Sequence, residues 1–177
     1  LMTKYHEIND KKRKFILIPD TAHGTNFASI AIGGYEARIL KSDHRGRVDI
    51  SDLQSKLDNN VAGLMLTQPN TLGLFEDQIE EIALSVHKAG GLMYMDGANL
   101  NALVGICKPA DMGFDIVHIN LHKTFSTPHG GGGQGSGPIA VNEKLKPYLP
   151  IPIVRQKNTG KYYWDNDCPK SVGQIHS

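Results

Sequence analysis

Apolar and polar residues follow one another along this chain in a pattern that predicts alternating strands and helices. Apolar runs and β-rich segments indicate strands at residues 15–18, 36–41, 61–66, 92–95, 115–119 and 138–141. Helical periodicity and helix-end signals indicate helices at residues 1–8, 27–32, 51–57 and 76–88. Because strands and helices alternate with short connections, we expect a mostly parallel α/β sheet with right-handed crossovers and helices on both faces.

The starts of two helices carry more specific expectations. Thr25 or Asn26 should cap the helix at residues 27–32, because either side chain can accept a hydrogen bond from a backbone N–H. Ser51 should open the next helix, since Ser51-Asp-Leu-Gln54 has the form of a capping box.

The pattern changes near residue 142. We expect residues 1–142 to form a partial large domain, because they contain all of the predicted strands. Residues 143–177 contain frequent prolines and lose periodicity, so we expect an irregular extension of the same domain with at most a short helix. Neither end carries a closing element, and we interpret the 177 residues as a fragment that leads toward a missing carboxy-terminal domain.

Composition narrows the classes of function. The chain is 40% hydrophobic and 21% charged with a net charge of +1, which is ordinary for a globular protein. We expect no nucleic-acid partner, because no basic stripe occurs, and no membrane partner, because no apolar run approaches the roughly 20 residues that span a bilayer. Cys107 and Cys168 have no paired spacing, and no histidine or cysteine spacing indicates a metal site. This cysteine usage suits the cytoplasm, with the mitochondrial matrix as the alternative.

Chemically reactive residues follow the predicted strands. In a parallel sheet the loops after the strands meet at one edge, where ligands bind. Those loops contain His23, Asn70, Asp96, Asn99, His122 and Lys123. Lys123 and Asp96 together suit pyridoxal phosphate (PLP) chemistry, since a lysine forms the Schiff base and a buried carboxylate keeps the pyridinium nitrogen protonated.

Each of these residues also has a structural interpretation. Lys123 could be a solvated surface charge, although its apolar flanks predict surroundings that disfavour the charged form and favour a nucleophile. Asp96 could be a helix N-cap or a carboxylate that points into the ligand crevice. His23 and His122 could be packed beside strand ends, or His122 could donate to a phosphate together with Asn120.

A glycine-rich segment occupies residues 130–137. It lacks the Gly-Lys-Ser/Thr ending of a Walker loop and the strand-to-helix setting of a dinucleotide site. His129-Gly-Gly-Gly132 is similar to the oxyanion loop of esterases, but no nucleophile elbow accompanies it. We expect this backbone to pass close to the cofactor or to a partner subunit, where side chains would clash.

Several segments carry a resemblance to a known family. The chain resembles the PLP-dependent glycine decarboxylase, the P-protein of the glycine cleavage system, at residues 20–26, 64–75, 94–101 and 120–133. Tyr162-Tyr163 and residues 169–173 extend the likeness, which is strongest to the second subunit of the split bacterial and archaeal enzyme. Gln68 and residues 134–136 depart from the family pattern. The resemblance implies an aspartate-aminotransferase-like fold of type I, of which this chain holds an incomplete large domain.

The resemblance also implies roles at the cofactor. Lys123 would be the Schiff-base lysine, and Asp96 would be the partner of the pyridine nitrogen. Asn99 would approach the phenolic oxygen of the ring, and His122 would bind the phosphate.

The reaction implied is the decarboxylation of glycine, with transfer of the aminomethyl group to the lipoyl arm of H-protein. This makes the enzyme formally an oxidoreductase, a glycine dehydrogenase of the aminomethyl-transferring type. His23 and Asn70 would line the substrate pocket. A first P-protein subunit or a second copy would be the protein partner. The upstream phosphate-loop region, the ring-stacking histidine and the small carboxy-terminal domain of the family have no counterpart in this sequence.

Two other interpretations stay open. Another enzyme of the same fold, such as a cysteine desulfurase or a threonine aldolase, carries an aspartate and a His-Lys pair at similar spacing. Alternatively, the chain is a non-catalytic fragment that only binds a partner subunit.

Overall fold

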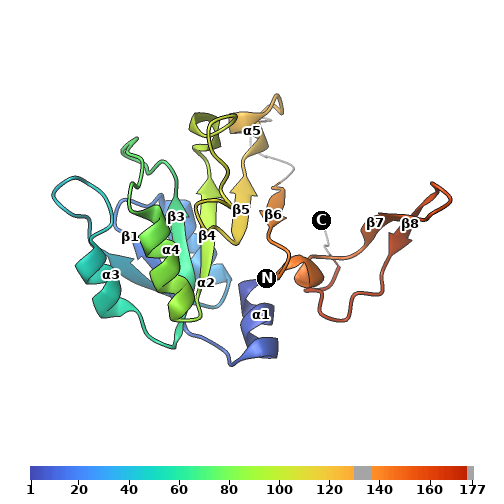
Figure 1. Cartoon of the computed structure of the whole chain (residues 1–177), viewed down its shortest axis with the longest axis horizontal. Helices are drawn as coiled ribbons and strands as arrows, with labels where there is room; N and C mark the ends of the chain where they lie inside the picture. The colour runs from blue at the N-terminus through green and yellow to red at the C-terminus, as the bar shows by residue number, and fades with distance from the viewer. Residues whose placement is uncertain (130–136, 175–177) are drawn as a thin grey trace.

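A six-stranded sheet organises the chain. The computed structural model describes residues 1–129 and 137–174, and within them the strand order is β2-β1-β3-β4-β5-β6 (Figure 1). The strands are β1 (Phe15–Pro19), β2 (Glu36–Leu40), β3 (Val61–Thr67), β4 (Leu92–Gly97), β5 (Ile116–Ile119) and β6 (Ile139–Val141). Strands β1 to β5 run parallel, and β6 runs antiparallel to β5. The predicted mostly parallel α/β sheet is therefore confirmed.

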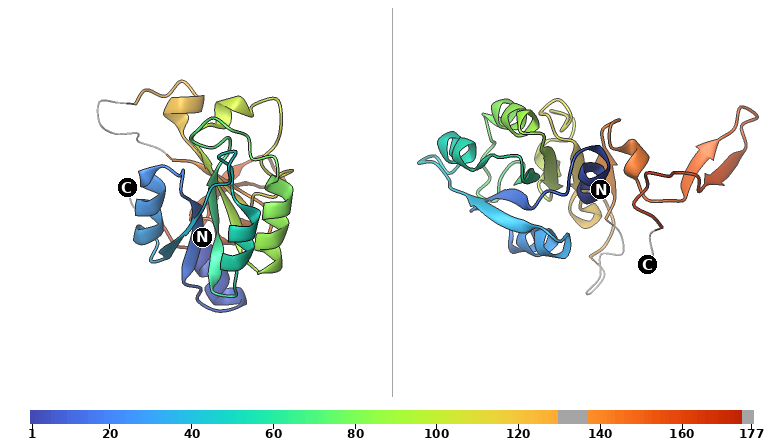
Figure 2. Two further views of the ribbon diagram at one scale, coloured as in Figure 1. Left: turned by 90° about the vertical axis from the view of Figure 1, so that its left-hand side faces the viewer. Right: turned by 90° about the horizontal axis from the view of Figure 1, so that it is seen from below.

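Helices cover both faces of this sheet, as predicted. Helix α2 (Gly24–Ile32) lies on one face, and α3 (Ile50–Lys56) and α4 (Ile79–Lys88) lie on the other (Figure 2). Helix α1 (Met2–Asn9) confirms the helix expected at the start of the chain. The shorter helices are α5 (Leu121–Thr124), η1 (Leu100–Ala102) and η2 (Lys146–Tyr148).

The main hydrophobic core lies between α4 and the centre of the sheet. The predicted stripe of α4 is buried as expected, at Ile79, Ile82, Ala83 and Val86. Strand β3 is buried at all seven residues, as in parallel sheets that helices cover on both faces. Each fully buried leucine or isoleucine contributes about 1.5–3 kcal/mol, so this packing fixes the strands whose ends carry the reactive residues.

The start of α2 differs from the prediction. The helix begins at Gly24, and its cap is His23, whose ring Nδ1 accepts a hydrogen bond from the Thr25 N–H at 3.1 Å. The expected caps, Thr25 and Asn26, both lie inside the helix. The prediction is wrong because an imidazole nitrogen one residue before the helix takes the role expected of a hydroxyl or an amide.

The start of α3 also differs. Asp49 is the cap, and its Oδ1 accepts hydrogen bonds from the N–H groups of Ser51 at 2.8 Å and Asp52 at 3.1 Å. Ser51 therefore lies in the first turn and does not open the helix. A carboxylate is a good acceptor for two N–H groups at once, which explains why the helix starts earlier than the capping-box pattern indicates.

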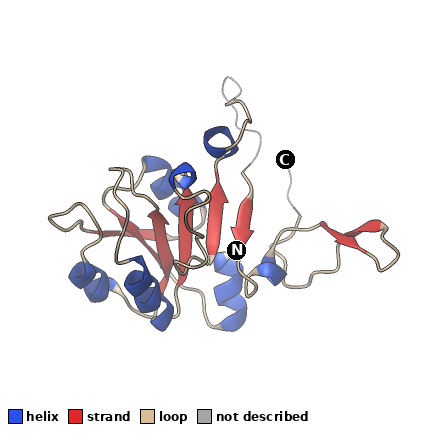
Figure 3. Ribbon diagram, turned by 45° about the horizontal axis from the view of Figure 1, so that its top comes forward, coloured by secondary structure: helices blue, strands red, loops and turns tan. Residues whose placement is uncertain are grey.

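Residues 143–174 contain a hairpin that the pattern analysis does not predict. Strand β7 (Ile153–Gln156) pairs antiparallel with β8 (Tyr162–Asp165), and the hairpin projects away from the main sheet (Figure 3). Its turn includes Gly160, whose φ of +80° is a conformation that glycine adopts without strain. The expectation of at most a short helix is therefore wrong, because a tight turn joins two β-rich runs among the prolines.

A buried carboxylate clamps the amino end of β5 to its neighbours. Asp115 precedes β5 and is 3% exposed. It accepts hydrogen bonds from His87 Nε2 at 2.8 Å and from the Met93 N–H at 2.7 Å. On its other oxygen, Asn142 Nδ2 donates at 2.6 Å and Lys144 Nζ lies at 2.7 Å. One side chain thus joins β5 to α4, to β4 and to the segment that follows β6.

We expect Asp115→Ala to lower the free energy of unfolding by about 3 kcal/mol, because it leaves buried donors and the Lys144 ammonium without an acceptor. Burial raises the pKa of Asp115, but the hydrogen bonds from His87, Lys144 and the Met93 N–H outweigh burial. The net pKa therefore lies below the ordinary 3.8. This stabilisation is therefore fully present above the ordinary value and is lost as the pH falls below it. Urea unfolding at neutral and acidic pH measures both effects.

The exposed Asp111→Ala variant is the matched control for this measurement. Equal losses of stability in the two variants, or a loss in Asp115→Ala that persists unchanged in acid, would contradict the clamp.

Candidate active site

A cleft of about 920 Å³ lies at the carboxyl edge of the sheet. Its volume falls within the roughly 300–1,000 Å³ of small-molecule sites. Among the predicted site residues, the cleft is lined by His23, Asp96, Asn99, Asn120, His122 and Lys123. Further lining residues include Thr25, Asn26, Ser29, Thr67, Tyr94, His118 and His129. The loops after the strands therefore do bring most of the predicted residues together.

Asp96 lies at the end of β4 and is 7% exposed. Its Oδ2 accepts hydrogen bonds from Asn26 Nδ2 of α2 at 3.0 Å and from Thr67 Oγ1 of β3 at 3.3 Å. Its Oδ1 accepts the Ala98 N–H at 2.9 Å. The His118 Nδ1 lies 3.9 Å from Oδ1, which is too long for a hydrogen bond and is an ion pair only when the ring is protonated. Asp96 therefore both closes its own turn and faces the ligand cleft.

The surroundings of Asp96 keep its carboxyl ionised. Burial raises its pKa, but the His118 ring, the Asn26 amide and the Ala98 N–H outweigh burial and lower the pKa to about 2. Burial and the charge of Asp96 raise the pKa of the neighbouring Tyr94 to about 12. At neutral pH the cleft thus offers a fixed carboxylate next to a neutral phenol, which suits a positively charged ring nitrogen.

Lys123 lies on α5, the four-residue helix that follows β5. Asn101 of η1 donates from Nδ2 to the Lys123 carbonyl oxygen at 2.8 Å and so ties α5 to the preceding loop. The Lys123 side chain lines the cleft and is exposed. The prediction that Lys123 lies among apolar groups is therefore wrong, as far as the described residues show. The reason is local: α5 ends at Thr124, the backbone becomes extended, and Phe125 turns toward solvent, 57% exposed.

Basic side chains gather on the α5 side of the cleft. The rings of His122 and His129 meet edge to face, with centroids 4.6 Å apart. Partial desolvation and the charges of His129, Lys123 and His118 lower the pKa of His122. Asn120 makes no capping bond at the start of α5, and its buried Oδ1 has no partner among the described residues. The imidazoles and the ammonium suit an anion such as a phosphate, and the free amide oxygen can accept a ligand hydrogen bond.

Two predicted residues are engaged with the loop after β3. Asn99 lines the cleft, but its Nδ2 donates to the carbonyl oxygens of Pro69 at 2.9 Å and Asn70 at 3.2 Å. The Asn70 side chain donates to the Gly46 carbonyl and accepts two N–H groups of its own loop. Asn70 is not part of the described lining of the cleft. Their roles toward a ligand stay predictions, and for Asn99 the amide would first have to leave these carbonyls.

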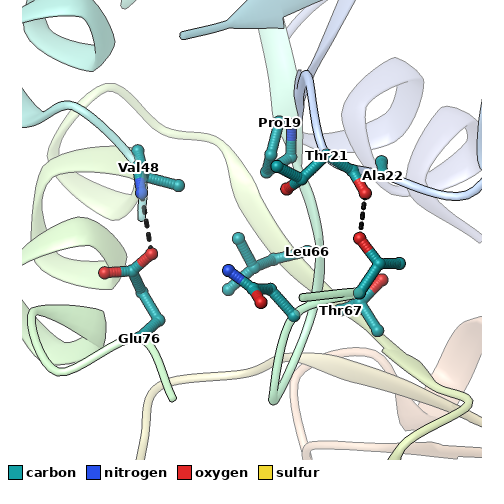
Figure 4. A pocket seen from close by; sticks show the side chains of 9 residues that line it. Pro19, Thr21, Ala22, Val48, Leu66, Thr67 and Glu76 are labelled. Atoms are coloured by element: carbon teal, nitrogen blue, oxygen red, sulfur yellow. Dashed lines mark hydrogen bonds between the residues drawn. The ribbon is translucent and has the colours of Figure 1, made fainter. Parts of the chain in front are cut away.

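A much smaller cavity of about 10 Å³ lies beneath the same loops (Figure 4). On one side of it, Thr71 Oγ1 donates to the Thr21 carbonyl. On the other side, the Val48 N–H donates to Glu76 Oε2 at 2.9 Å. The space holds about one water molecule, so it is not a second ligand site. The bond between Thr71 and Thr21 joins the loops after β3 and β1 and supports one wall of the cleft.

Three residues around Asp96 were not predicted as site residues, namely Asn26, His118 and Thr67. Asn26 lies one turn before Ile30, and these two are the buried residues of α2. A polar residue on the core-facing side of the helix was therefore the available signal. His118 interrupts an apolar strand, which is a similar signal. Thr67 extends β3 one residue beyond its expected end.

Other expectations concern segments or sites that the structure describes only in part. The glycine-rich segment expected to approach the cofactor lies outside the described residues, apart from Gly137, which lines the cleft. Within residues 1–129 and 137–174, no cluster of three His, Cys, Asp or Glu side chains is arranged to hold a metal ion. None of the described helices combines the length and apolar character needed to cross a membrane.

Comparison with known proteins identifies relatives along the whole chain. A model of the aminotransferase class-V family matches residues 2–148. Relatives named probable glycine dehydrogenase (decarboxylating) subunit 2 occur in Caldanaerobacter subterraneus, 57% identical over 100% of this chain, and in Chlorobium chlorochromatii, 62% identical over 99%. The protein of that name from Pyrococcus abyssi is 55% identical over 99% of this chain. The chain spans only 35–36% of these three relatives, about a third of their length.

Solved structures share the fold. The crystal structure of glycine decarboxylase (P-protein) of the glycine cleavage system, in inhibitor-bound form, superimposes with a TM-score of 0.67 and 21% identity. That match covers 92% of this chain and 36% of the other. An aromatic aminotransferase from Pyrococcus horikoshii gives a TM-score of 0.61 at 15% identity, covering 81% and 41% of the two chains. The predicted fold class is confirmed, and the chain corresponds to part of the fold seen in these larger proteins.

We expect Gly97→Ala to disrupt the site and the fold together. A Cβ at Gly97 would lie 2.0 Å from the carbonyl oxygen of His118, which forces β4 away from β5 beside Asp96. The expected loss in the free energy of unfolding is about 3 kcal/mol. Gly24→Ala is the control, because its Cβ meets no atom within 4 Å and alanine favours the helix. Urea unfolding compares the two, and similar stabilities would contradict the close approach of the strands.

Proposed function

The chain belongs to the aminotransferase class-V family, and from this premise we propose that it is part of a PLP-dependent enzyme that decarboxylates glycine. The proposal rests on the observation that Asp96 and Lys123 line the same cleft. The choice of reaction is supported by whole-chain relatives named glycine dehydrogenase (decarboxylating) subunit 2. Because the chain spans about a third of those relatives, the activity is proposed for the complete enzyme.

The residues of the cleft fit PLP, the cofactor of this family. Asp96, with its pKa of about 2, is the charged acceptor that a protonated pyridine nitrogen requires. His122 and Asn120 would hold the phosphate, and Lys123 would anchor the cofactor through its ε-amino group. When bound, PLP supplies an electron sink for the charge left on the amino-acid carbon as carbon dioxide departs.

The remaining residues would position the substrate. His23 accepts the Thr25 N–H at Nδ1, so its ring carries a proton on Nε2 and can donate it toward a carboxylate in the cleft. Asn99 would turn from its present carbonyl partners to the phenolic oxygen of the ring. Asn70 would act through the loop that it holds together.

The partners follow from the same proposal. We propose that the aminomethyl group left after decarboxylation passes to the lipoyl arm of H-protein. The word "subunit" in the names of the relatives supports a first subunit of the same enzyme as the protein partner, with a second copy of this chain as the alternative. The unpaired Cys107 and Cys168 suit a reducing compartment, and we propose the cytoplasm.

Borohydride trapping tests the anchor. We expect the full chain to develop visible absorbance with PLP, and borohydride to leave a stable pyridoxyl label on the peptide that contains Lys123. Lys123→Ala should lose this label, because no other lysine lines the described cleft. Lys108→Ala, at an exposed position in the loop after β4, should retain it. A label spread over several lysines, or none in the wild type, would contradict the assignment.

A second assay separates the proposed reaction from its alternatives. The complete enzyme that contains this chain is supplied with lipoylated acceptor and with glycine labelled at the carboxyl carbon. Release of labelled carbon dioxide that depends on Lys123 supports glycine decarboxylation. A desulfurase or an aldolase would carry the pyridoxyl label on Lys123 but would release no labelled carbon dioxide. A non-catalytic fragment would not retain PLP.

A further inference from the structure

Asp96 is surrounded by polar side chains from three neighbouring elements. Thr67 on β3 and His118 on β5 are its register partners in the parallel sheet. Asn26 reaches it from α2, which covers that face. Of the three side-chain contacts, the one from Asn26 is the shortest at 3.0 Å, and Asn26 is itself only 7% exposed. A buried amide is thus committed to the carboxylate.

We propose that Asn26 is a positioning residue, which holds the Asp96 carboxylate ionised and oriented for a protonated pyridine nitrogen. The identity of that ring rests on the proposed function, whereas the contact between the two side chains does not. An N–H donor stabilises a carboxylate more strongly than its protonated form. Without this donor, a buried carboxyl takes up a proton more readily.

The orientation follows because both carboxylate oxygens are held. Oδ2 accepts from Asn26, and Oδ1 accepts from the Ala98 N–H at 2.9 Å. Rotation of the carboxylate about its last torsion would break both hydrogen bonds. A carboxylate has about four acceptor positions, so Asp96 keeps capacity for a ligand in the cleft that it lines.

The packing of α2 holds Asn26 in place. Ile30, one turn further along the helix, packs with Ile18 of β1 in a buried cluster, so this face of α2 cannot leave the sheet without losing apolar contacts. Ile32, the last residue of α2, is 88% exposed and is not among the residues that line the cleft. Ile32 therefore provides a control on the same helix.

The test is a carboxyl NMR titration of the full chain with ¹³C-labelled aspartate, followed by titration with PLP. Wild-type Asp96 should titrate with a pKa of about 2. In Asn26→Ala that pKa should rise, and PLP should bind about tenfold more weakly, since a hydrogen bond to a charged group is lost. Ile32→Ala should change neither quantity.

Asn26→Asp keeps the shape but replaces the donor by a second carboxyl group. Two carboxyls at this distance share one proton, so the pair should titrate in two separated steps. While the shared proton is present it can serve as the donor, and PLP affinity should approach that of the wild type. As the pH rises and that proton is lost, the affinity should fall.

A structural role alone would not produce this pH step. The other titratable groups around the pair are Tyr94 on β4, His118 on β5 and His23 at the start of α2. All three are present in every variant, so a step confined to Asn26→Asp belongs to the new carboxyl pair. Asn26→Ala should bind weakly at every pH.

A folded Asn26→Ala chain with unchanged Asp96 titration and unchanged PLP affinity would overturn the proposal. If Asn26→Ala does not fold, Asn26→Asp decides, because absence of its pH step would overturn the proposal equally. If the wild type binds no PLP, the proposed function fails, and the Asp96 titration alone decides the role of Asn26. A raised pKa of Asp96 in Asn26→Ala then supports the role of the Asn26 amide, and an unchanged pKa of Asp96 contradicts it.

Discussion

The carboxylate of Asp96 can stay charged at a buried strand end only because the fold brings donors to both of its oxygens. Parallel strands place Thr67, Asp96 and His118 in one row, and α2 adds Asn26. An unpaired buried charge costs several kcal/mol, so this carboxylate could not exist here without the helix and the neighbouring strands. The fixed negative charge in turn determines what the cleft can bind, together with Lys123 and His122, which line the same cleft.

The two ends of the sheet have different tasks. At the amino end, the buried carboxylate of Asp115 joins β5 to α4 and β4 by accepting hydrogen bonds from His87 and the Met93 N–H. At the carboxyl end, Gly97 permits the close approach of β4 and β5, and the side chains above it are polar and open to the cleft. The amino end is thus held by a buried carboxylate, whereas the carboxyl edge, where parallel α/β sheets bind their ligands, presents polar side chains to the cleft.

Sequence pattern was sufficient where the surroundings of a residue depend on its own element. Apolar runs locate the strand ends that present Asp96 and Lys123, and helical periodicity locates the buried stripe of α4. Pattern was not sufficient for Asn26, whose partner lies 70 residues away in sequence. Nor does it give the exposure of Lys123, which depends on where a four-residue helix ends, or the hairpin around Gly160, where a local turn outweighs the nearby prolines.

The ¹⁵N NMR signal of PLP labelled at its ring nitrogen tests the central claim most directly, namely that Asp96 is the charged partner of that nitrogen. With the wild-type chain we predict the chemical shift of a protonated pyridine nitrogen at neutral pH. With Asp96→Asn, which keeps the shape but carries no charge, we predict the shift of an unprotonated ring. An unprotonated nitrogen in the wild type, or a protonated one in both proteins, would contradict the account.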